Sequence, residues 1–305
     1  MHSVKILSTV AETKEIIKQI KNEGRTIGFV PTMGFFHEGH LELMRRSIKE
    51  CGETFVSIFV NPIQFGPNED LSKYPRDLSR DSAMAEKTGV KYIFHPQAAE
   101  MYPEGFQTSV KAGALAEDFC GALRPGHFDG VCTVVAKLFN IITPDLAYFG
   151  MKDYQQLAVI EKMTEDLNMS VKIVKCETVR EKDGLAMSSR NSYLTAGERE
   201  IAPAIKENIE FARNAVIEMA AKPGGTLLEK LIEGRKLDLI RRGFKSVDYF
   251  KIADAKTLKE IPDLDGLRRC STIFIAAAAV LGKTRLIDNS VFDIKKIKGP
   301  RRNYQ

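Results

Sequence analysis

The amino-acid sequence predicts an α/β protein: a Rossmann-like, doubly wound parallel sheet followed by a smaller C-terminal α+β domain. Through about the first 180 residues, short apolar runs alternate with amphipathic helical segments, which is the pattern of a mainly parallel sheet. The rest of the chain instead shows two long helical patterns and then strand-like runs. We therefore expect two domains, residues 1–180 and residues 181–305.

Helix caps and hydrophobic periodicity give the elements of the first domain. Thr9 to Glu12 have the spacing of a capping box, and the helix that they open ends at Gly24. Apolar runs rich in β-branched and aromatic residues predict strands at 26–30, 54–60, 90–94, 145–150 and 170–175. Helices are expected at 41–48, 77–88, 131–142 and 151–167, with a glycine-rich loop at 120–130.

The second domain is expected to begin with a long helix over 196–221, which Pro223-Gly224-Gly225 interrupts. A second helix is expected from Thr226 to about 242, and strand-like runs follow at 247–252, 272–280 and 285–288. Helices followed by strands, without strict alternation, indicate an α+β unit.

Composition indicates an ordinary globular protein, since 44% of the residues are hydrophobic and 28% are charged. No apolar run has the length of a membrane span, and the N-terminal segment lacks the apolar core of a signal peptide. The five cysteines include no C-x-x-C pair, which favours free thiols in a reducing compartment. The sequence thus predicts a cytoplasmic protein that does not bind membranes.

The formal net charge of +5 is concentrated at the C-terminus. Five bases and no acid fall in the last eleven residues, and the remaining 40 bases match the 40 acids. A solvated basic tail explains this pattern better than a nucleic-acid-binding groove. We therefore expect no nucleic-acid partner. The five bases are Lys295, Lys296, Lys298, Arg301 and Arg302.

The segment 30–40 connects an expected strand to an expected helix. His37 and His40 lie three residues apart where the helix should begin, so both rings can face one ligand. Gly34 and Gly39 allow close approach of the backbone. Turns of this kind place phosphates on free backbone N–H groups, so we expect a phosphate site here.

Two other interpretations of the histidine pair stay open at this point. The histidines can simply cap the helix. They can also bind zinc, but zinc proteases space their histidines four apart around a glutamate, and no third ligand is evident here.

Polar residues follow other expected strands. Gln64 comes after the strand at 54–60, and Lys152 begins a helix after the strand at 145–150. A lysine beside a phosphate site can neutralise charge that develops on pyrophosphate. Ser188, Ser189 and Arg190, further on, are strong phosphate ligands in a flexible, charged stretch that begins near Arg180.

Several motifs resemble those of one family. His37-x-Gly39-His40 resembles the H-x-G-H signature of a nucleotidyltransferase superfamily. The longer Pro31-Thr32-Met33-Gly34-x-x-His37-x-Gly39-His40 resembles the pantothenate synthetase (pantoate–β-alanine ligase) family. Phe35-Phe36 departs slightly from the commoner pattern, which has leucine before the histidine. Further similar motifs are Asn61-Pro62-x-Gln64-Phe65, Arg124-Pro125-Gly126-His127-Phe128, Gly150-x-Lys152-Asp153-x-Gln155-Gln156 and Met187-Ser188-Ser189-Arg190-Asn191.

The resemblance implies an ATP-dependent ligase that joins pantoate to β-alanine. Pantoate would first form pantoyl adenylate with release of pyrophosphate, and β-alanine would then displace AMP. The resemblance also implies Mg²⁺ as a cofactor and a homodimer.

The resemblance further implies roles for individual residues. His37, His40 and Lys152 would be catalytic, with His40 as the acid. An acidic residue near Asp77 or Asp81 is a candidate for holding Mg²⁺. The implied substrate-binding residues are Gln64, Gln156, Asn61 and Arg124. The implied ATP-binding residues are Met33, Gly34, Phe35, Phe36, His37, Glu38, Gly39, His40, Gly150, Met151, Lys152, Asp153, Val179, Met187, Ser188, Ser189 and Arg190.

Two rival functions remain open. One is another H-x-G-H enzyme, such as a cytidylyltransferase or a class I aminoacyl-tRNA synthetase, although these lack the contexts of Gln64 and Gln156. The other is a non-catalytic nucleotide- or RNA-binding module that uses the basic tail.

Overall fold

The computed structural model describes residues 3–67, 69, 71–221 and 227–297. The chain divides into two compact units, Met1–Val179 and Arg180–Gln305. The expected break at Pro223-Gly224-Gly225, the helix start at Thr226 and the basic tail beyond Ile297 lie outside the described residues.

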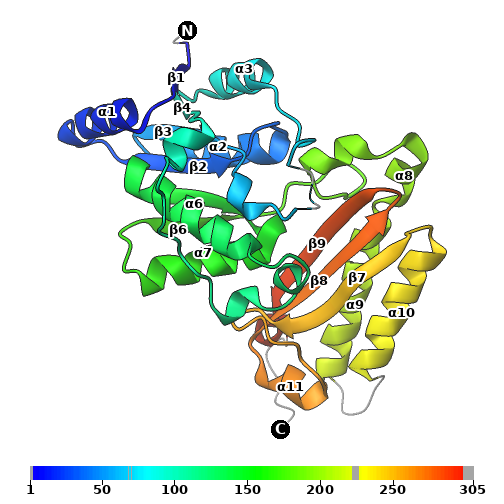
Figure 1. Cartoon of the computed structure of the whole chain (residues 1–305). Coiled ribbons are helices and arrows are strands. Elements are labelled where there is room, and N and C mark those ends of the chain that lie inside the picture. Colours follow the sequence, from blue (N-terminus) through cyan, green and yellow to red (C-terminus); the bar gives the residue numbers. More distant parts are fainter. Residues whose placement is uncertain (1–2, 68, 70, 222–226, 298–305) are drawn as a thin grey trace. The chain divides into compact units, whose positions relative to one another are not determined.

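The first unit is built on a six-stranded sheet in which every strand pair is parallel (Figure 1). The spatial order is β1-β4-β3-β2-β5-β6, so the chain moves from β2 toward one edge and from β5 toward the other. Ligands of doubly wound sheets bind where the order reverses, beyond the carboxyl ends of the strands. The expected fold class is therefore confirmed. The strands are β1 (Lys5–Leu7), β2 (Ile27–Thr32), β3 (Glu53–Ile58), β4 (Tyr92–Phe94), β5 (Leu146–Gly150) and β6 (Lys172–Cys176).

Helices cover both faces of this sheet, because successive residues of a strand point to opposite faces. Phe29 of β2 meets Phe139 of α6, with ring centroids 6.4 Å apart, whereas Val30 shares a core cluster with Met44 of α2. α2 packs with α3, and α6 packs with α1 and α7. The helices and 3₁₀ turns are α1 (Val10–Asn22), α2 (Glu38–Glu50), η1 (Pro62–Gln64), α3 (Leu78–Thr88), α4 (Ala98–Met101), η2 (Ala114–Ala116), α5 (Cys120–Leu123), α6 (His127–Ile142), η3 (Met151–Asp153) and α7 (Tyr154–Asp166).

The second unit is a three-stranded antiparallel sheet, in the order β7-β8-β9, with helices packed against it. Ile252, Ile273 and Ile275 of the sheet share a core with Ala212 and Val216 of α9. This is the expected α+β unit. Its elements are η4 (Ser189–Tyr193), α8 (Ala196–Ile201), α9 (Ala204–Ala221), α10 (Leu228–Arg241), β7 (Ser246–Asp254), α11 (Leu264–Arg269), β8 (Thr272–Leu281), β9 (Thr284–Asp293) and α12 (Ile294–Ile297).

Three local features differ from the expected elements. β1 is not among the expected strands, because only Leu7 of its three residues is buried and so short a strand shows no periodicity. The expected loop at 120–130 contains α5 and the first turn of α6, which starts at His127. The expected long helix at 196–221 is split near Pro203, because proline cannot donate to the helical ladder.

The close packing of α2 on β2 depends on Gly28. A Cβ at this position would lie 2.1 Å from Oγ of Ser47 and 2.9 Å from Sγ of Cys51. Ser47 is itself buried on α2 and hydrogen-bonds Thr54 of β3 at 2.8 Å. Gly28 therefore lets the C-terminal end of α2 lie directly against the sheet.

Gly28→Ala should lower the free energy of unfolding by about 1–3 kcal/mol, the usual cost of overpacking a core. The measurement is chemical denaturation of both variants. Gly234→Ala is the matched control, because no atom lies within 4 Å of a Cβ there and alanine favours the helix α10. Equal stability of the Gly28 variant and the wild type would contradict this account of the packing.

Candidate active site

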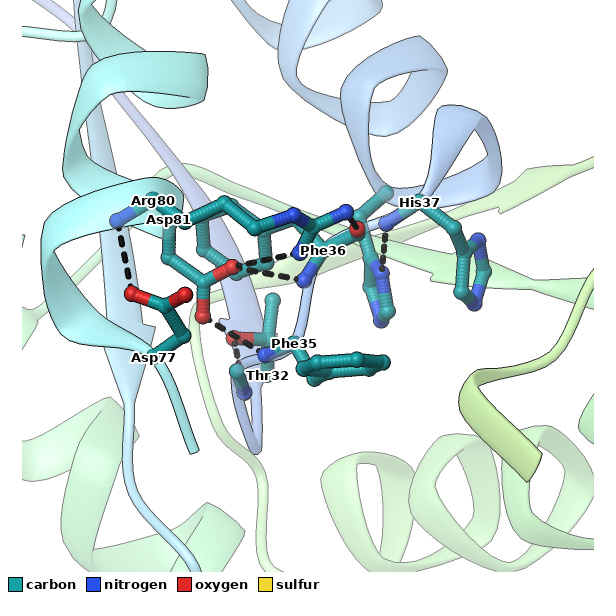
Figure 2. A network of polar contacts seen from close by, with 9 residues as sticks. Thr32, Phe35, Phe36, His37, Asp77, Arg80 and Asp81 are labelled. Atoms are coloured by element: carbon teal, nitrogen blue, oxygen red, sulfur yellow. Dashed lines mark hydrogen bonds and ion pairs between the residues drawn. The ribbon is translucent and has the colours of Figure 1, made fainter. Parts of the chain in front are cut away.

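The loop between β2 and α2 is held by hydrogen bonds from its own backbone N–H groups to side chains (Figure 2). The N–H of Gly34 donates to Oγ1 of Thr32 at 3.1 Å. The N–H groups of Phe35 and Phe36 donate to the two carboxylate oxygens of Asp81 at 2.6 and 2.8 Å. Asp81 lies on α3 and is only 1% exposed, so one buried carboxylate holds two successive amides.

Arg80 supports the same loop from the same helix. Its Nη2 donates to the carbonyl oxygen of Phe36 at 2.8 Å, and its guanidinium carbon lies 5.0 Å from the ring centroid of Phe35. Asp77 caps α3 by accepting the N–H of Arg80 at 2.9 Å. Burial raises the pKa of the Asp81 carboxyl, and the two amide hydrogen bonds counter that shift.

The backbone of this loop has an unusual conformation. Gly34 and Phe35 have φ values of 84° and 52°, in the left-handed region that favours glycine. A Cβ at Gly34 would lie 3.0 Å from both Oδ2 of Asp81 and Cγ2 of Ile58. Glycine is therefore required at position 34 by its conformation and by its surroundings. The hydrogen bond to Asp81 offsets the strain at Phe35.

These bonds correct the expectation that a phosphate binds free backbone amides in this loop. The amides of Gly34, Phe35 and Phe36 are already paired, and those of His37 and Gly39 donate to histidine rings. A phosphate can therefore gain little from these five N–H groups. Side chains have to supply the donors instead.

The two histidines form a reciprocal cap at the start of α2. Nδ1 of His37 accepts the N–H of Gly39 at 3.1 Å, and Nδ1 of His40 accepts the N–H of His37 at 3.3 Å. Because Nδ1 accepts in both rings, the proton of each neutral imidazole lies on Nε2. The histidines do cap the helix, and by doing so they become oriented Nε2–H donors.

His40 is neutral near pH 7. Its pKa is well below the usual value, chiefly because of burial and then because a charge on His40 would be repelled by a protonated His37 ring and by the Lys152 ammonium. The His37 and His40 ring centroids are 4.1 Å apart, and the buried ring of Phe36 lies 5.6 Å from that of His40. His40 can therefore donate a hydrogen bond to an anion without carrying a charge itself.

Lys152 reaches the same region from the neighbouring strand. β5 pairs with β2 through Gly28 and Phe29, so the carboxyl ends of both strands lie side by side. Lys152 follows β5 in η3, its side chain is 19% exposed, and its Nζ lies 3.6 Å from Asp153 Oδ2. The topology thus brings the two histidines and the lysine to one place, as the switch point predicts.

Asn61 and Gln64 form a second polar group beyond β3, and both are buried. Nδ2 of Asn61 donates to Oε1 of Gln64 and to the carbonyl oxygen of Gly130, each at 3.1 Å. Nε2 of Gln64 lies 3.0 Å from the sulfur of Met33, which belongs to the β2–α2 loop. The structure therefore brings Gln64 next to the loop that carries the histidines.

Gln155 and Gln156 differ in role. Gln155 is buried and braces the segment before α6, because it accepts the N–H of Cys120 at 2.9 Å and donates to the carbonyls of Leu115 and Asp118. Gln156 is partly exposed, and its side chain makes no hydrogen bond to the residues that the structure describes. Gln156 is the one of the pair that can meet a substrate.

Arg124, an expected substrate ligand, interacts with Glu69 and His127. Its guanidinium makes a two-pronged ion pair with Glu69 and approaches Nε2 of His127 at 2.9 Å. Because arginine can only donate, His127 accepts at Nε2, and its Nδ1–H donates to the carbonyl of Gln64 at 2.8 Å. Burial and the Arg124 charge lower the pKa of His127 to about 4. Arg124 therefore supports Gln64 through His127.

The charged stretch that begins the second unit makes ion pairs with other elements of that unit. Arg180 pairs with the buried Asp288 at 2.6 and 2.9 Å, and Arg199 holds Glu181 and Asp183, each at 2.5 Å. The stretch looks solvated in sequence because its partners lie on other elements. The neighbouring Leu185 belongs to the core of the unit.

The expected phosphate-closing residues follow this stretch. Ser188 caps η4 by accepting the N–H of Arg190 at 3.3 Å. The Asn191 side chain donates to Glu181 and to the carbonyl of Ala186, both at 3.1 Å. The backbone around the serines is thus braced within the second unit.

Both acidic candidates for Mg²⁺ have structural roles in the first unit. Both oxygens of Asp81 accept loop amides, and Asp77 caps α3. Within residues 3–67, 69, 71–221 and 227–297, no group of three or more His, Cys, Asp or Glu side chains gathers as a metal site.

The supporting contacts of two residues could not be predicted from the sequence. Asp81 and His127 both act on segments that are distant in the chain, 46 and 63 residues away. His127 lies within a motif, which is a weak signal. Asp81 was expected only as a candidate near a Mg²⁺ site, and nothing in the sequence indicates that it holds the loop amides.

The reversal of strand order, the capped histidine pair and the lysine on the next strand together define a nucleotide-binding α/β domain of the H-x-G-H class. A family model described as pantoate-beta-alanine ligase matches residues 5–291, and the chain belongs to this family. The resemblance seen in the motifs is therefore confirmed.

Sequence similarity to known proteins extends over nearly the whole chain. The pantothenate synthetase of Caldicellulosiruptor saccharolyticus is 47% identical over 289 residues, which cover 95% of this chain and 99% of that protein. The pantothenate synthetase of Caldicellulosiruptor bescii is 49% identical over 290 residues, which cover 95% of this chain and 99% of that protein.

Solved structures that resemble this chain belong to the same family. The pantothenate synthetase of Thermus thermophilus gives a TM-score of 0.83 at 41% identity, covering 95% of this chain and 99% of that chain. The pantoate-beta-alanine ligase of Francisella tularensis, solved as a complex with β-γ ATP and β-alanine, gives a TM-score of 0.75 at 32% identity. The match covers 96% of this chain and 98% of that chain. These likenesses favour a ligase over a cytidylyltransferase or a tRNA synthetase.

Asp81→Asn should lower kcat/KM for ATP by about 10-fold to 100-fold, on the scale of a misplaced catalytic group. Asparagine keeps one acceptor oxygen but turns an NH₂ group toward a loop amide, so donor faces donor. The loop and the histidine that follows it should then shift. Steady-state kinetics with ATP as the varied substrate measures the effect.

Asp77→Asn is the matched control for this variant. It removes the same charge from the same helix, yet asparagine caps a helix as well as aspartate does. We expect kcat/KM for ATP to stay within about twofold of wild type. Equal losses in both variants would show that local charge, not loop geometry, is what matters.

Proposed function

We propose that this chain condenses pantoate with β-alanine in two half-reactions at one site. The pantoate carboxylate attacks the α-phosphorus of ATP, a P–O bond to pyrophosphate breaks, and pantoyl adenylate forms. The β-alanine amine then attacks the acyl carbon, loses a proton, and AMP leaves. The observation that carries this proposal is the convergence of His37, His40 and Lys152 at the switch point of a chain of this family.

The histidines and the lysine stabilise charge on the phosphate oxygens. Neutral Nε2–H donors and one ammonium suit a reaction in which negative charge moves from the α-phosphate toward pyrophosphate. His40 then acts as a hydrogen-bond donor, which refines its expected role as an acid. The proposed ATP contacts are Met33, Gly34, Phe35, Phe36, His37, Glu38, Gly39, His40, Gly150, Met151, Lys152, Asp153, Val179, Met187, Ser188, Ser189 and Arg190.

Gln64, Asn61 and Gln156 are proposed to hold pantoate. Pantoate offers a carboxylate and hydroxyl groups, and amide side chains can donate to such oxygens from fixed positions. The contact between Gln64 and Met33 supports this role, because it places the amide beside the ATP loop. Gln64 also suits β-alanine, which must approach the same acyl carbon.

Further properties are proposed from the family. ATP would arrive as its Mg²⁺ complex, with the phosphates as the main ligands, since the acidic candidates are committed elsewhere. A homodimer and a cytoplasmic location are also proposed. None of the helices in the described segments has the length and apolar character needed to cross a bilayer.

His40→Ala should lower kcat by about 10²-fold or more, the usual scale for a lost transition-state donor. Because the pKa of His40 is depressed, the neutral ring is the active form. In the wild type, kcat/KM for ATP should therefore not fall as the pH rises through about 6.5, the ordinary histidine pKa. A decline across that range that disappears in His40→Asn would instead identify a charged imidazolium as the active species.

The order of the half-reactions gives a further prediction. Labelled pyrophosphate should exchange into ATP when pantoate and Mg²⁺ are present and β-alanine is absent, and it should stop without pantoate. Gln156→Ala should slow this exchange while ATP binding stays nearly unchanged, because it removes a pantoate contact only. Isotope exchange and nucleotide titration measure the two effects. Exchange that requires β-alanine would exclude a separate adenylate step.

A further inference from the structure

The hydroxyl of Tyr102 is joined to Gln64 through Asn61. Tyr102 follows α4, outside every motif that points to the function, and its Oη lies 2.7 Å from Oδ1 of Asn61. Asn61 is 1% exposed and Gln64 is 8% exposed, so their amides meet protein groups. The three side chains form one continuous chain of hydrogen bonds.

Only one placement of protons satisfies all the hydrogen bonds among Tyr102, Asn61 and Gln64. A backbone carbonyl can only accept, so the Asn61 atom that faces the carbonyl of Gly130 must be the NH₂ group. The second N–H of that group then meets Gln64, which must present its oxygen there. The Asn61 oxygen is left for Tyr102, which must donate. Gln64 consequently directs its own NH₂ group away from Asn61, toward the sulfur of Met33.

Tyr102 is suited to act as a permanent donor. Burial raises the pKa of its hydroxyl, so it keeps its proton throughout the neutral range. Its ring is also held in place: Phe106 lies 5.1 Å away edge to face, and Lys137 Nζ lies 5.7 Å from the ring centroid. The direction of the O–H bond toward Asn61 is therefore stable.

We propose that Tyr102 is a positioning residue that fixes Gln64 as a hydrogen-bond donor toward an oxygen of the substrate acid. This deepens the proposed function and rests on it where it names pantoate. Thioether sulfur is a weak acceptor, so the Gln64 NH₂ group retains donor capacity beside Met33. If the amide were reversed, its oxygen would face the carboxylate or hydroxyl oxygens of pantoate, and two acceptors would repel each other.

The backbone of Gln64 is held independently of Tyr102. His127 donates to its carbonyl at 2.8 Å. The first turn of α6 also presses on η1, because a Cβ at Gly130 would lie 2.5 Å from the carbonyl oxygen of Ile63. Loss of the Tyr102 hydroxyl should therefore free the amides to rotate while the turn itself stays in place.

Tyr102→Phe tests the proposal, because it removes one oxygen atom and keeps the ring. KM for pantoate should rise about 10-fold, the loss expected for one hydrogen bond in a buried network. KM for ATP should stay within about twofold. A rise of both KM values together would overturn the proposal, since it would show a general disturbance of the site.

A double-mutant cycle shows whether the hydroxyl acts through Gln64. In a Gln64→Ala background, Tyr102→Phe should leave KM for pantoate unchanged, because the amide that it orients is gone. The same rise of about 10-fold in both backgrounds would overturn the relay. Tyr148→Phe is the matched control: it removes a buried hydroxyl that bonds Glu50 at 3.0 Å and Cys51 at 3.4 Å.

A measurement without substrate separates this proposal from the proposed function. The side-chain NH₂ signals of Gln64, assigned by their absence in Gln64→Ala, should shift in the NMR spectrum of Tyr102→Phe and stay in place in Tyr148→Phe. Unshifted Gln64 signals would overturn the relay even if the wild type makes pantothenate. A wild type that makes no pantothenate, with shifted signals, would overturn the proposed function and leave the Tyr102–Gln64 coupling established.

Discussion

A buried carboxylate, that of Asp81, determines the geometry of the β2–α2 loop, which forms the half of the site that is proposed to face the phosphates. Asp81 takes two successive amides, holds Phe35 in the left-handed region and so fixes the point at which α2 begins. His37 and His40 then cap α2 with Nδ1 and keep their protons on Nε2. In the proposed function, phosphate recognition therefore rests on side chains, whose donors are oriented before any ligand arrives, and not on the backbone.

The half of the site that is proposed to face pantoate is likewise held by buried hydrogen bonds. A group that has only one possible role settles the protons of its neighbours: the Gly130 carbonyl can only accept, and the Arg124 guanidinium can only donate. From these two groups the donor and acceptor atoms of Asn61, Gln64 and His127 follow. Buried polar networks that are satisfied in this way hold one arrangement, because every alternative leaves a donor or acceptor unpaired.

Local patterns in the sequence were enough to predict five of the six parallel strands and the longer helices of the first unit, because capping signals and periodicity extend over only a few residues. Features set by distant partners could not be predicted. The hydrogen bond from Phe35 to Asp81 spans 46 residues, and the Arg180–Asp288 pair at the start of the second unit spans 108. The ion pair of Arg124 with Glu69 was not predicted for the same reason, since the two residues lie 55 positions apart.

The span of the Asp81 clamp has a consequence for how the protein is made. A growing chain that ends before α3 already contains the histidines and glycines of the β2–α2 loop, but it lacks the acceptor that shapes them. Loop geometry must wait until β3 has joined β2 and α3 has docked on α2, because contacts over long separations form after local ones. The loop that is proposed to bind the nucleotide therefore takes its final shape only after the chain has been made through α3.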